Sequence, residues 1–379
     1  MDFSSSEAEQ RFRAELRAWL AAHVPRGPLP ETLAAEAAFL TAWQRTLHAG
    51  GWVGVHWPRE YGGRGASLTE TAIYQEEMAR ARAPQPMNRV GINNVGPTLM
   101  AHGSEAQRRR YLPPILSGEE IWCQLYSEPN AGSDLASLRA RADKQGDAWI
   151  LNGQKVWTSY AQFAAFAIVL ARTDAAAPLH QGISCFILDM RAPGLTIRPL
   201  RQLTGSAEFS ETFFDNVVIP RAHLIGAEHD GWRVATATLA HERGTSFAFK
   251  EQVLHRIYLD ELAEALRAGG GARHPVLRQR WAASAIEVEI LRLHNCATMS
   301  RLARGELPGA ESSLVKLFWA GLSQRLTALG HDALGPAAQL AAGPWAQRML
   351  WSRCASIAGG TDEIQRNIIA QRLLGLPKN

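Results

Sequence analysis

The change of pattern that decides the fold falls at Cys123-Gln124-Leu125-Tyr126-Ser127-Glu128-Pro129-Asn130-Ala131-Gly132-Ser133-Asp134. Before this segment, apolar residues recur at helical spacing, and after it short apolar runs alternate with turn residues. Within it, Ser127 and Ser133 offer hydroxyls, Gly132 lets a ligand approach the backbone, and successive loop amides can hold a phosphate. By spacing alone, an ordinary Gly/Ser/Asp turn is the simpler interpretation.

The part of the chain before this segment is predicted to be helical. Residues 7–22 place apolar side chains at helical spacing, and prolines follow directly. Further helices are predicted over residues 32–49, 68–82 and about 91–116. The stretch 51–65 is rich in glycine, proline and aromatic residues, so we expect a structured loop there.

The middle of the chain is predicted to form strands. Trp149-Ile150-Leu151 and Lys155-Val156-Trp157 flank Asn152-Gly153, a pair that accepts the positive φ angles of a tight turn, so we expect a hairpin there. Further strands are predicted at residues 166–171, 183–188, 195–199 and 211–218.

The C-terminal part returns to the helical pattern. Long helices rich in alanine and leucine are predicted over residues 232–267, 275–304, 312–329 and 363–374. Antiparallel helices with such apolar faces form bundles. We therefore expect an α+β, multi-domain chain: an N-terminal helical domain (1–120), a middle β-barrel-like domain (121–228) and a C-terminal four-helix bundle (229–379).

Composition narrows the class of protein. The net charge is +4 and the pI about 9.0, but the basic residues are scattered, so solvated helix faces explain them better than nucleic-acid binding. The four cysteines form no CxxC pair and no zinc-ligand spacing, so we expect reduced thiols and no metal site. No leader pattern and no apolar stretch of transmembrane length occurs, so we expect a soluble cytoplasmic protein without a membrane or nucleic-acid partner.

Several separated motifs resemble those of the acyl-CoA dehydrogenases. Ser127 to Asp134 is similar to the family's S-E-P-x-A-G-S-D loop, and Lys155 to Ser159 is similar to its K-x-W-x-[T/S] strand end. Four further stretches resemble family motifs in the same order: Trp57–Gly63, Phe213–Pro220, Gly226–Trp232 and Ala358–Arg366. The resemblance covers nearly the whole chain. It implies an oligomeric flavoprotein of lipid metabolism, a dimer or tetramer, that oxidises an acyl-CoA and passes electrons to an electron-transfer flavoprotein.

The resemblance also implies a set of residues that bind FAD. These are Gln124, Tyr126, Ser127, Ser133, Trp157, Ser159, Gly360, Thr361 and Glu363. By the same resemblance, Trp157 packs beside the isoalloxazine, Ser159 bonds near flavin N5 and O4, and Ser133 also touches the CoA part of the substrate. An indole that covers the ring and hydroxyls near its reacting nitrogen suit this role.

The reaction needs a base on the substrate face opposite the flavin. Many family members place a glutamate just before the Gly-Thr of the closing loop, where this chain has Gly359. Other members carry it on the helix that lines the pocket, and Glu242 matches that position. The alternative for Glu242 is a structural ion pair with Arg243 or Lys250. Arg243 itself either contacts the substrate or base, or faces solvent.

Two departures from the family pattern leave alternatives open. The Arg-x-x-Phe-Gly motif is missing from residues 267–275, and the later Gln-x-x-Gly-Gly segment is missing near residues 333–336. In the family the first motif reaches the FAD of a neighbouring subunit. The chain could therefore be a partner subunit of a hetero-oligomer, or a flavin oxidase or oxygenase on the same scaffold, besides an active dehydrogenase.

Overall fold

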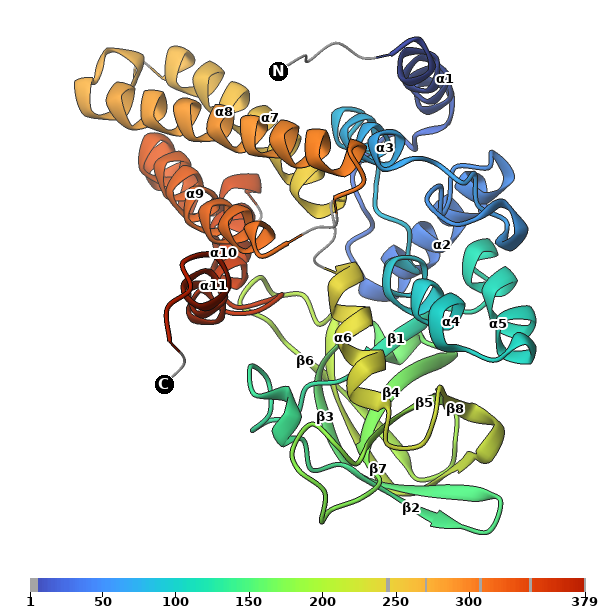
Figure 1. The fold of residues 1–379 in the computed structure, drawn as a ribbon. Coiled ribbons are helices and arrows are strands. Elements are labelled where there is room, and N and C mark those ends of the chain that lie inside the picture. The colour runs from blue at the N-terminus through green and yellow to red at the C-terminus, as the bar shows by residue number, and fades with distance from the viewer. Residues whose placement is uncertain (1–5, 243–245, 270, 307–308, 341–342, 378–379) are drawn as a thin grey trace. The chain divides into compact units, whose positions relative to one another are not determined.

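The computed structural model describes residues 6–242, 246–269, 271–306, 309–340 and 343–377 (Figure 1). The helices are α1 Glu7–His23, α2 Leu33–Ala49, α3 Leu68–Arg80, α4 Gly96–His102, α5 Glu105–Ser117, α6 Gly231–Glu242, α7 Ser246–Ala268, α8 Pro275–Ala303, α9 Glu311–Leu334, α10 Pro344–Ser352 and α11 Asp362–Ile368. The strands are β1 Trp122–Leu125, β2 Arg141–Gln145, β3 Ala148–Ser159, β4 Phe166–Arg172, β5 Ile183–Asp189, β6 Leu195–Leu200, β7 Phe209–Pro220 and β8 Leu224–Ile225. The predicted order of helices, strands and helices is confirmed.

The chain divides into two compact units that interleave along the sequence. The first contains Met1–Val24, Ser67–Ala83 and Arg243–Asn379, and the second contains Pro25–Ala66 and Pro84–Glu242. The helix predicted over residues 232–267 is described as α6 in the second unit and α7 in the first, with residues 243–245 outside the described part. The three domain boundaries inferred from the sequence stay a prediction. Within the described residues, no helix is both long and apolar enough to cross a bilayer.

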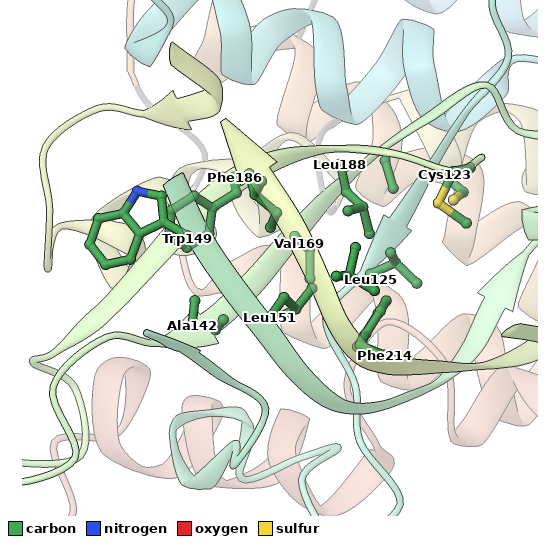
Figure 2. Close-up of a cluster of buried hydrophobic side chains, with 14 of the residues drawn as sticks. Cys123, Leu125, Ala142, Trp149, Leu151, Val169, Phe186, Leu188 and Phe214 are labelled. Atoms are coloured by element: carbon green, nitrogen blue, oxygen red, sulfur yellow. The ribbon is translucent and has the colours of Figure 1, made fainter. Parts of the chain in front are cut away.

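An eight-stranded sheet forms the centre of the second unit. Its order is β6-β7-β3-β2-β4-β5-β8, and β1 pairs in parallel with β4. Side chains of β4 and β5 are buried almost throughout, which explains why both strands read as continuous apolar runs. Figure 2 shows the core that these strands enclose, where Trp149, Phe186 and Phe214 are among its largest side chains.

The prediction of a hairpin at Asn152-Gly153 is wrong. Residues 148–159 form the single strand β3, and the register against β7 shifts between Leu151 and Gly153. The true hairpin joins β2 to β3 through Gly146-Asp147, with Gly146 at φ 58°. Gly153 has a different purpose, since a Cβ there would lie 2.8 Å from the Cα of Ala140. Close backbone approach, rather than a turn, requires this glycine.

Two buried amides fix the start of β1. The Asn88 side chain accepts a bond from the backbone N–H of Trp122 at 2.8 Å and donates to the carbonyls of Ile115 and Glu120. The Gln44 side chain donates to the Ile115 carbonyl and accepts from the Asn88 backbone N–H. Both side chains are fully buried with their polar atoms bonded, so α2, α5 and β1 are held in one arrangement.

The first unit is a helical assembly with its own core. α3 lies against α1, α7 and α8, and α9 lies against α7, α8 and α10. Glu77 of α3 is 2% exposed and accepts bonds from Arg13 and Arg17 of α1. These bonds outweigh the effect of burial and lower the pKa of Glu77, so the link between α1 and α3 is charged at neutral pH.

Two glycines of α9 give a matched test of this packing. A Cβ at Gly330 would lie 2.0 Å from the Trp345 ring, whereas a Cβ at Gly321 would meet only the end of the Arg325 side chain at 2.8 Å. We expect Gly330→Ala to destabilise the protein by about 1–3 kcal/mol through overpacking. Gly321→Ala should stabilise it by up to about 1 kcal/mol through helix propensity. Urea unfolding of both variants measures the difference, and equal effects would contradict this packing.

Candidate functional site

A buried ion pair joins the loop after β1 to strand β3. Lys155 of β3 is fully buried, and its Nζ donates to the Glu128 carboxylate at 2.8 Å and to the Tyr126 carbonyl at 3.0 Å. The same carboxylate accepts bonds from the backbone N–H groups of Arg139 and Ala140 at 2.7 and 2.9 Å. One carboxylate therefore fixes both ends of the loop from residue 126 to residue 140.

The buried Lys155 ammonium is stable only while Glu128 is present as its counter-charge. Burial lowers the pKa of the Lys155 ammonium, and the charge and hydrogen bond of Glu128 oppose that effect. A buried charge without its partner costs several kcal/mol. The glutamate of the S-E-P stretch and the lysine of the K-x-W stretch are thus two halves of one interaction.

Two residues beyond Lys155, the indole of Trp157 is held out of the core. Trp157 is 61% exposed, has φ 62°, and lies where the β3–β7 register shifts between Lys155 and Thr158. Positive φ is rare for a bulky residue and costs about 1–3 kcal/mol, so it persists only where surrounding contacts impose it. Phe209 of β7 supports the indole edge-on, with ring centroids 6.2 Å apart. The bulge presents a flat aromatic surface outward.

Three serines of the predicted site, Ser127, Ser133 and Ser159, belong to the second unit, as Trp157 does. The Ser127 carbonyl accepts a bond from the Val156 N–H at 2.9 Å, which fastens the loop to β3 beside Trp157. Ser127 and Ser159 are half-buried, and Ser133 is exposed. A Cβ at Gly132 would meet nothing within 4 Å, so the loop is open on this side. An aromatic face, three hydroxyls and an open glycine suit a large planar cofactor with a phosphate tail.

A chain of hydrogen bonds connects the end of β1 to α6. The Tyr126 hydroxyl donates to Thr238 at 3.0 Å, and Thr98 and Thr238 share a bond of 2.8 Å. Thr98 also donates to the Asn94 carbonyl, and the Asn94 side chain donates to Gln124 at 3.0 Å. Thr98 and Thr238 are fully buried. These bonds fix one face of α6 against the residues predicted to contact FAD.

The predicted base and its neighbours lie at the end of α6 and the start of α7. Glu242 ends α6, one turn after Thr238, and its side chain and all of Arg243 lie outside the described residues. Lys250, the alternative partner of Glu242, lies 3.3 Å from Glu251. Their roles stay predictions.

Gly360, Thr361 and Glu363 belong to the first unit. The Thr361 hydroxyl accepts a bond from the Ile364 N–H and caps α11, and Gly360 has φ 94°. Lys316 of α9 lies 3.5 Å from Asp362, beside this turn. Asp362 and Glu363 lie in the first turn of α11, where acidic side chains interact favourably with the helix dipole. Their approach to FAD stays a prediction.

Sequence reasoning missed the residues that support the site. The motifs contain Glu128 and Lys155 but do not predict that the two side chains form a buried pair, and no motif points to Asn94 or Thr238. The available signal was chemical: a lysine between apolar strand residues predicts a buried partner. In the described residues, no group of three or more His, Cys, Asp or Glu side chains could hold a metal ion.

Comparison with known proteins identifies the family of this chain. Family models of the N-terminal, middle and C-terminal domains of acyl-CoA dehydrogenases match residues 6–119, 123–217 and 229–374. The chain belongs to the acyl-CoA dehydrogenase family. Acyl-CoA dehydrogenase IpdE1 of Mycobacterium tuberculosis is 41% identical over 97% of this chain and 98% of its own length.

Solved acyl-CoA dehydrogenases share the fold. A steroid ACAD, Tcur3481-Tcur3483, aligns over 100% of both chains with a TM-score of 0.89 and 30% identity. The ChsE4-ChsE5 complex of Mycobacterium tuberculosis aligns over 100% of both with a TM-score of 0.87 and 31% identity. The predicted fold class, enzyme class and FAD cofactor are thereby confirmed: this acyl-CoA dehydrogenase is a flavoprotein oxidoreductase.

We expect Lys155→Met to lower the free energy of unfolding by about 3–5 kcal/mol, because Glu128 is left buried without its cation. The double variant Lys155→Met/Glu128→Gln should recover part of this loss. Lys144→Met is the control, since Lys144 forms an exposed pair with Glu228 at 2.9 Å and should cost at most about 1 kcal/mol. Urea unfolding followed by tryptophan fluorescence tests all three, and a loss for Lys155→Met no larger than the control would refute the anchoring role.

Proposed function

We propose that this dehydrogenase oxidises an acyl-CoA thioester between its α and β carbons, with Glu242 as the base that removes the α proton. The observation that carries the proposal is Trp157, an indole held outward at φ 62° by a strand bulge and 61% exposed. A strained, exposed aromatic residue next to a fastened loop supports a cofactor-binding surface. FAD, when bound, supplies the acceptor for the hydride that leaves the β carbon.

We assign the remaining roles in the reaction to residues of this chain. Trp157 covers the flavin ring, and Ser127 and Ser159 donate hydrogen bonds to it. Ser133 contacts the phosphate-bearing part of FAD or CoA. The bonds of Thr238 hold α6 in place, and Glu242, one turn later on α6, would remove the α proton. A dry pocket would keep that carboxylate basic enough to accept the proton.

For the substrate, we propose a bulky, ring-bearing acyl group. Gly359 stands where many family members carry the catalytic glutamate, so the closing loop presents no side chain there. A base carried on α6 frees the closing loop of its carboxylate, and a glycine at position 359 takes up the least room of any residue. The similarity to a protein described as a steroid ACAD supports the same class.

An anaerobic titration tests the reaction. A steroid-type acyl-CoA should bleach the flavin absorbance, and Glu242→Gln should slow bleaching by about 10²–10⁴-fold because the general base is lost. Glu228→Gln is the control: its half-buried carboxylate pairs with Lys144 and His229, neither of which belongs to the proposed site, so bleaching should be unchanged. Bleaching by Glu242→Gln at the normal rate would remove Glu242 from the mechanism.

The same sample distinguishes the electron acceptor. We propose an electron-transfer flavoprotein, so the bleached protein should regain its colour when that protein is added and only slowly in air. Rapid recovery in air would instead indicate a flavin oxidase or oxygenase.

A second candidate function is one chain of a hetero-oligomeric dehydrogenase. Gly359, the missing Arg-x-x-Phe-Gly motif and the similarity to the ChsE4-ChsE5 complex favour it. In that case, tagged chain purified from its own host should carry a second acyl-CoA dehydrogenase chain in near-equal amount by mass spectrometry. The chain expressed alone should then hold less than one FAD per protomer. One FAD per protomer in a homogeneous oligomer would count against this candidate.

A further inference from the structure

A π-helical segment, Gly91–Val95, places an amide against the end of β1. Asn94 of this segment donates from Nδ2 to the Gln124 Oε1 at 3.0 Å. Single π-helical turns inside α-helical regions occur often at functional sites, because they shift one side chain out of the regular register. Both amides are half-buried. Their bond connects this segment to a residue of the predicted FAD site.

The segment is fixed in place by its neighbours. The Trp57 indole N–H donates to the Ile92 carbonyl at 2.9 Å, and a Cβ at Gly96 would lie 2.0 Å from that ring. A Cβ at Gly91 would lie 2.3 Å from the Asn88 Oδ1, the atom that holds the start of β1. The Asn94 carbonyl accepts the Thr98 hydroxyl at 2.7 Å. The backbone that carries Asn94 is therefore fixed beside Gln124.

The direction of this bond decides which end of the Gln124 amide faces Asn94 and which end is left for a ligand. Since Nδ2 of Asn94 is the donor, the Oε1 of Gln124 is occupied as an acceptor. The Nε2 of Gln124, with two N–H donors, is directed away from Asn94. In the described part of the chain, this nitrogen has no protein acceptor. Gln124 is thus presented as a hydrogen-bond donor next to the loop that carries Ser127.

We propose that Asn94 is a positioning residue that holds Gln124 as a hydrogen-bond donor to an acceptor atom of the flavin ring. The inference rests on the proposed FAD site and adds a residue to it. Reduced flavin is richer in electrons than oxidised flavin, so a donor binds it more strongly and raises the reduction potential. Asn94 would thereby tune the cofactor without touching it.

Asn94→Asp tests this polarity directly. A carboxylate only accepts hydrogen bonds, so Gln124 must turn its Nε2 toward position 94 and present Oε1 to the flavin. We expect FAD to dissociate about tenfold more readily. Because the lost bond is stronger to reduced flavin, we expect reduced flavin to lose a further tenfold in binding, which lowers the midpoint potential by about 30 mV for this two-electron couple. Flavin fluorescence on release and dye-coupled potentiometry measure the two quantities.

Asn93→Asp is the matched control, because it adds the same charge one residue away, and the Asn93 side chain has no hydrogen-bond partner among the described residues. It should leave both quantities near the wild-type values. In a Gln124→Met background, Asn94→Asp should change the potential no more than Asn93→Asp does. Gln124→Glu keeps an acceptor for Asn94 but loses the donor, so it should reproduce the fall in potential even if Asn94→Asp fails to fold.

Each outcome decides the inference. A potential shift in Asn94→Asp that equals that of Asn93→Asp, or that persists without Gln124, would overturn it. An unchanged potential in Gln124→Glu would also overturn it. If wild-type protein binds FAD and is bleached by an acyl-CoA in these cases, the proposed function survives alone. Wild-type protein, purified with any partner chain it carries, that binds no FAD would overturn both.

Discussion

The buried pair between Lys155 and Glu128 is the interaction on which the candidate site depends. A fully buried ammonium is tolerated only with a bonded counter-charge, and here Lys155 donates to one carboxylate and one carbonyl. The carboxylate in turn satisfies two backbone N–H groups. The pair thus favours one loop geometry, because a loop path that moved Glu128 away would leave the Lys155 ammonium buried and unpaired.

The strain at Trp157 follows from this constraint. Lys155 must point inward to reach Glu128, while β3 continues beside β7 to Ser159. The bulge between Lys155 and Thr158 absorbs the mismatch, and the residue inside it takes φ 62° with its indole outward. Hydroxyl and amide bonds then link the neighbouring end of β1 to α6 through Thr98 and Thr238. The predicted cofactor surface and α6 share one network of polar contacts within the second unit.

Buried polar groups, rather than apolar contacts alone, specify this arrangement. The sheet core of Figure 2 would tolerate other apolar side chains of similar volume. The amides of Asn88 and Gln44 could not be replaced in this way. Each bonds to several backbone groups, and its loss would leave those donors and acceptors buried and unpaired. The chain differs from the family pattern at Gly359 and nevertheless belongs to the family.

Local sequence determined the order of elements, because helical and strand periods are properties of neighbouring residues. It also determined the family, because Ser127–Asp134 and Lys155–Ser159 are contiguous motifs. It failed at Asn152-Gly153, where the preference for a turn was overruled by pairing with β7. The contacts of Asn94 with Gln124 and of Lys155 with Glu128 span 30 and 27 residues. Only the tertiary structure could decide them, since hydrogen-bond partners depend on which distant segments the sheet and helices bring within about 3 Å.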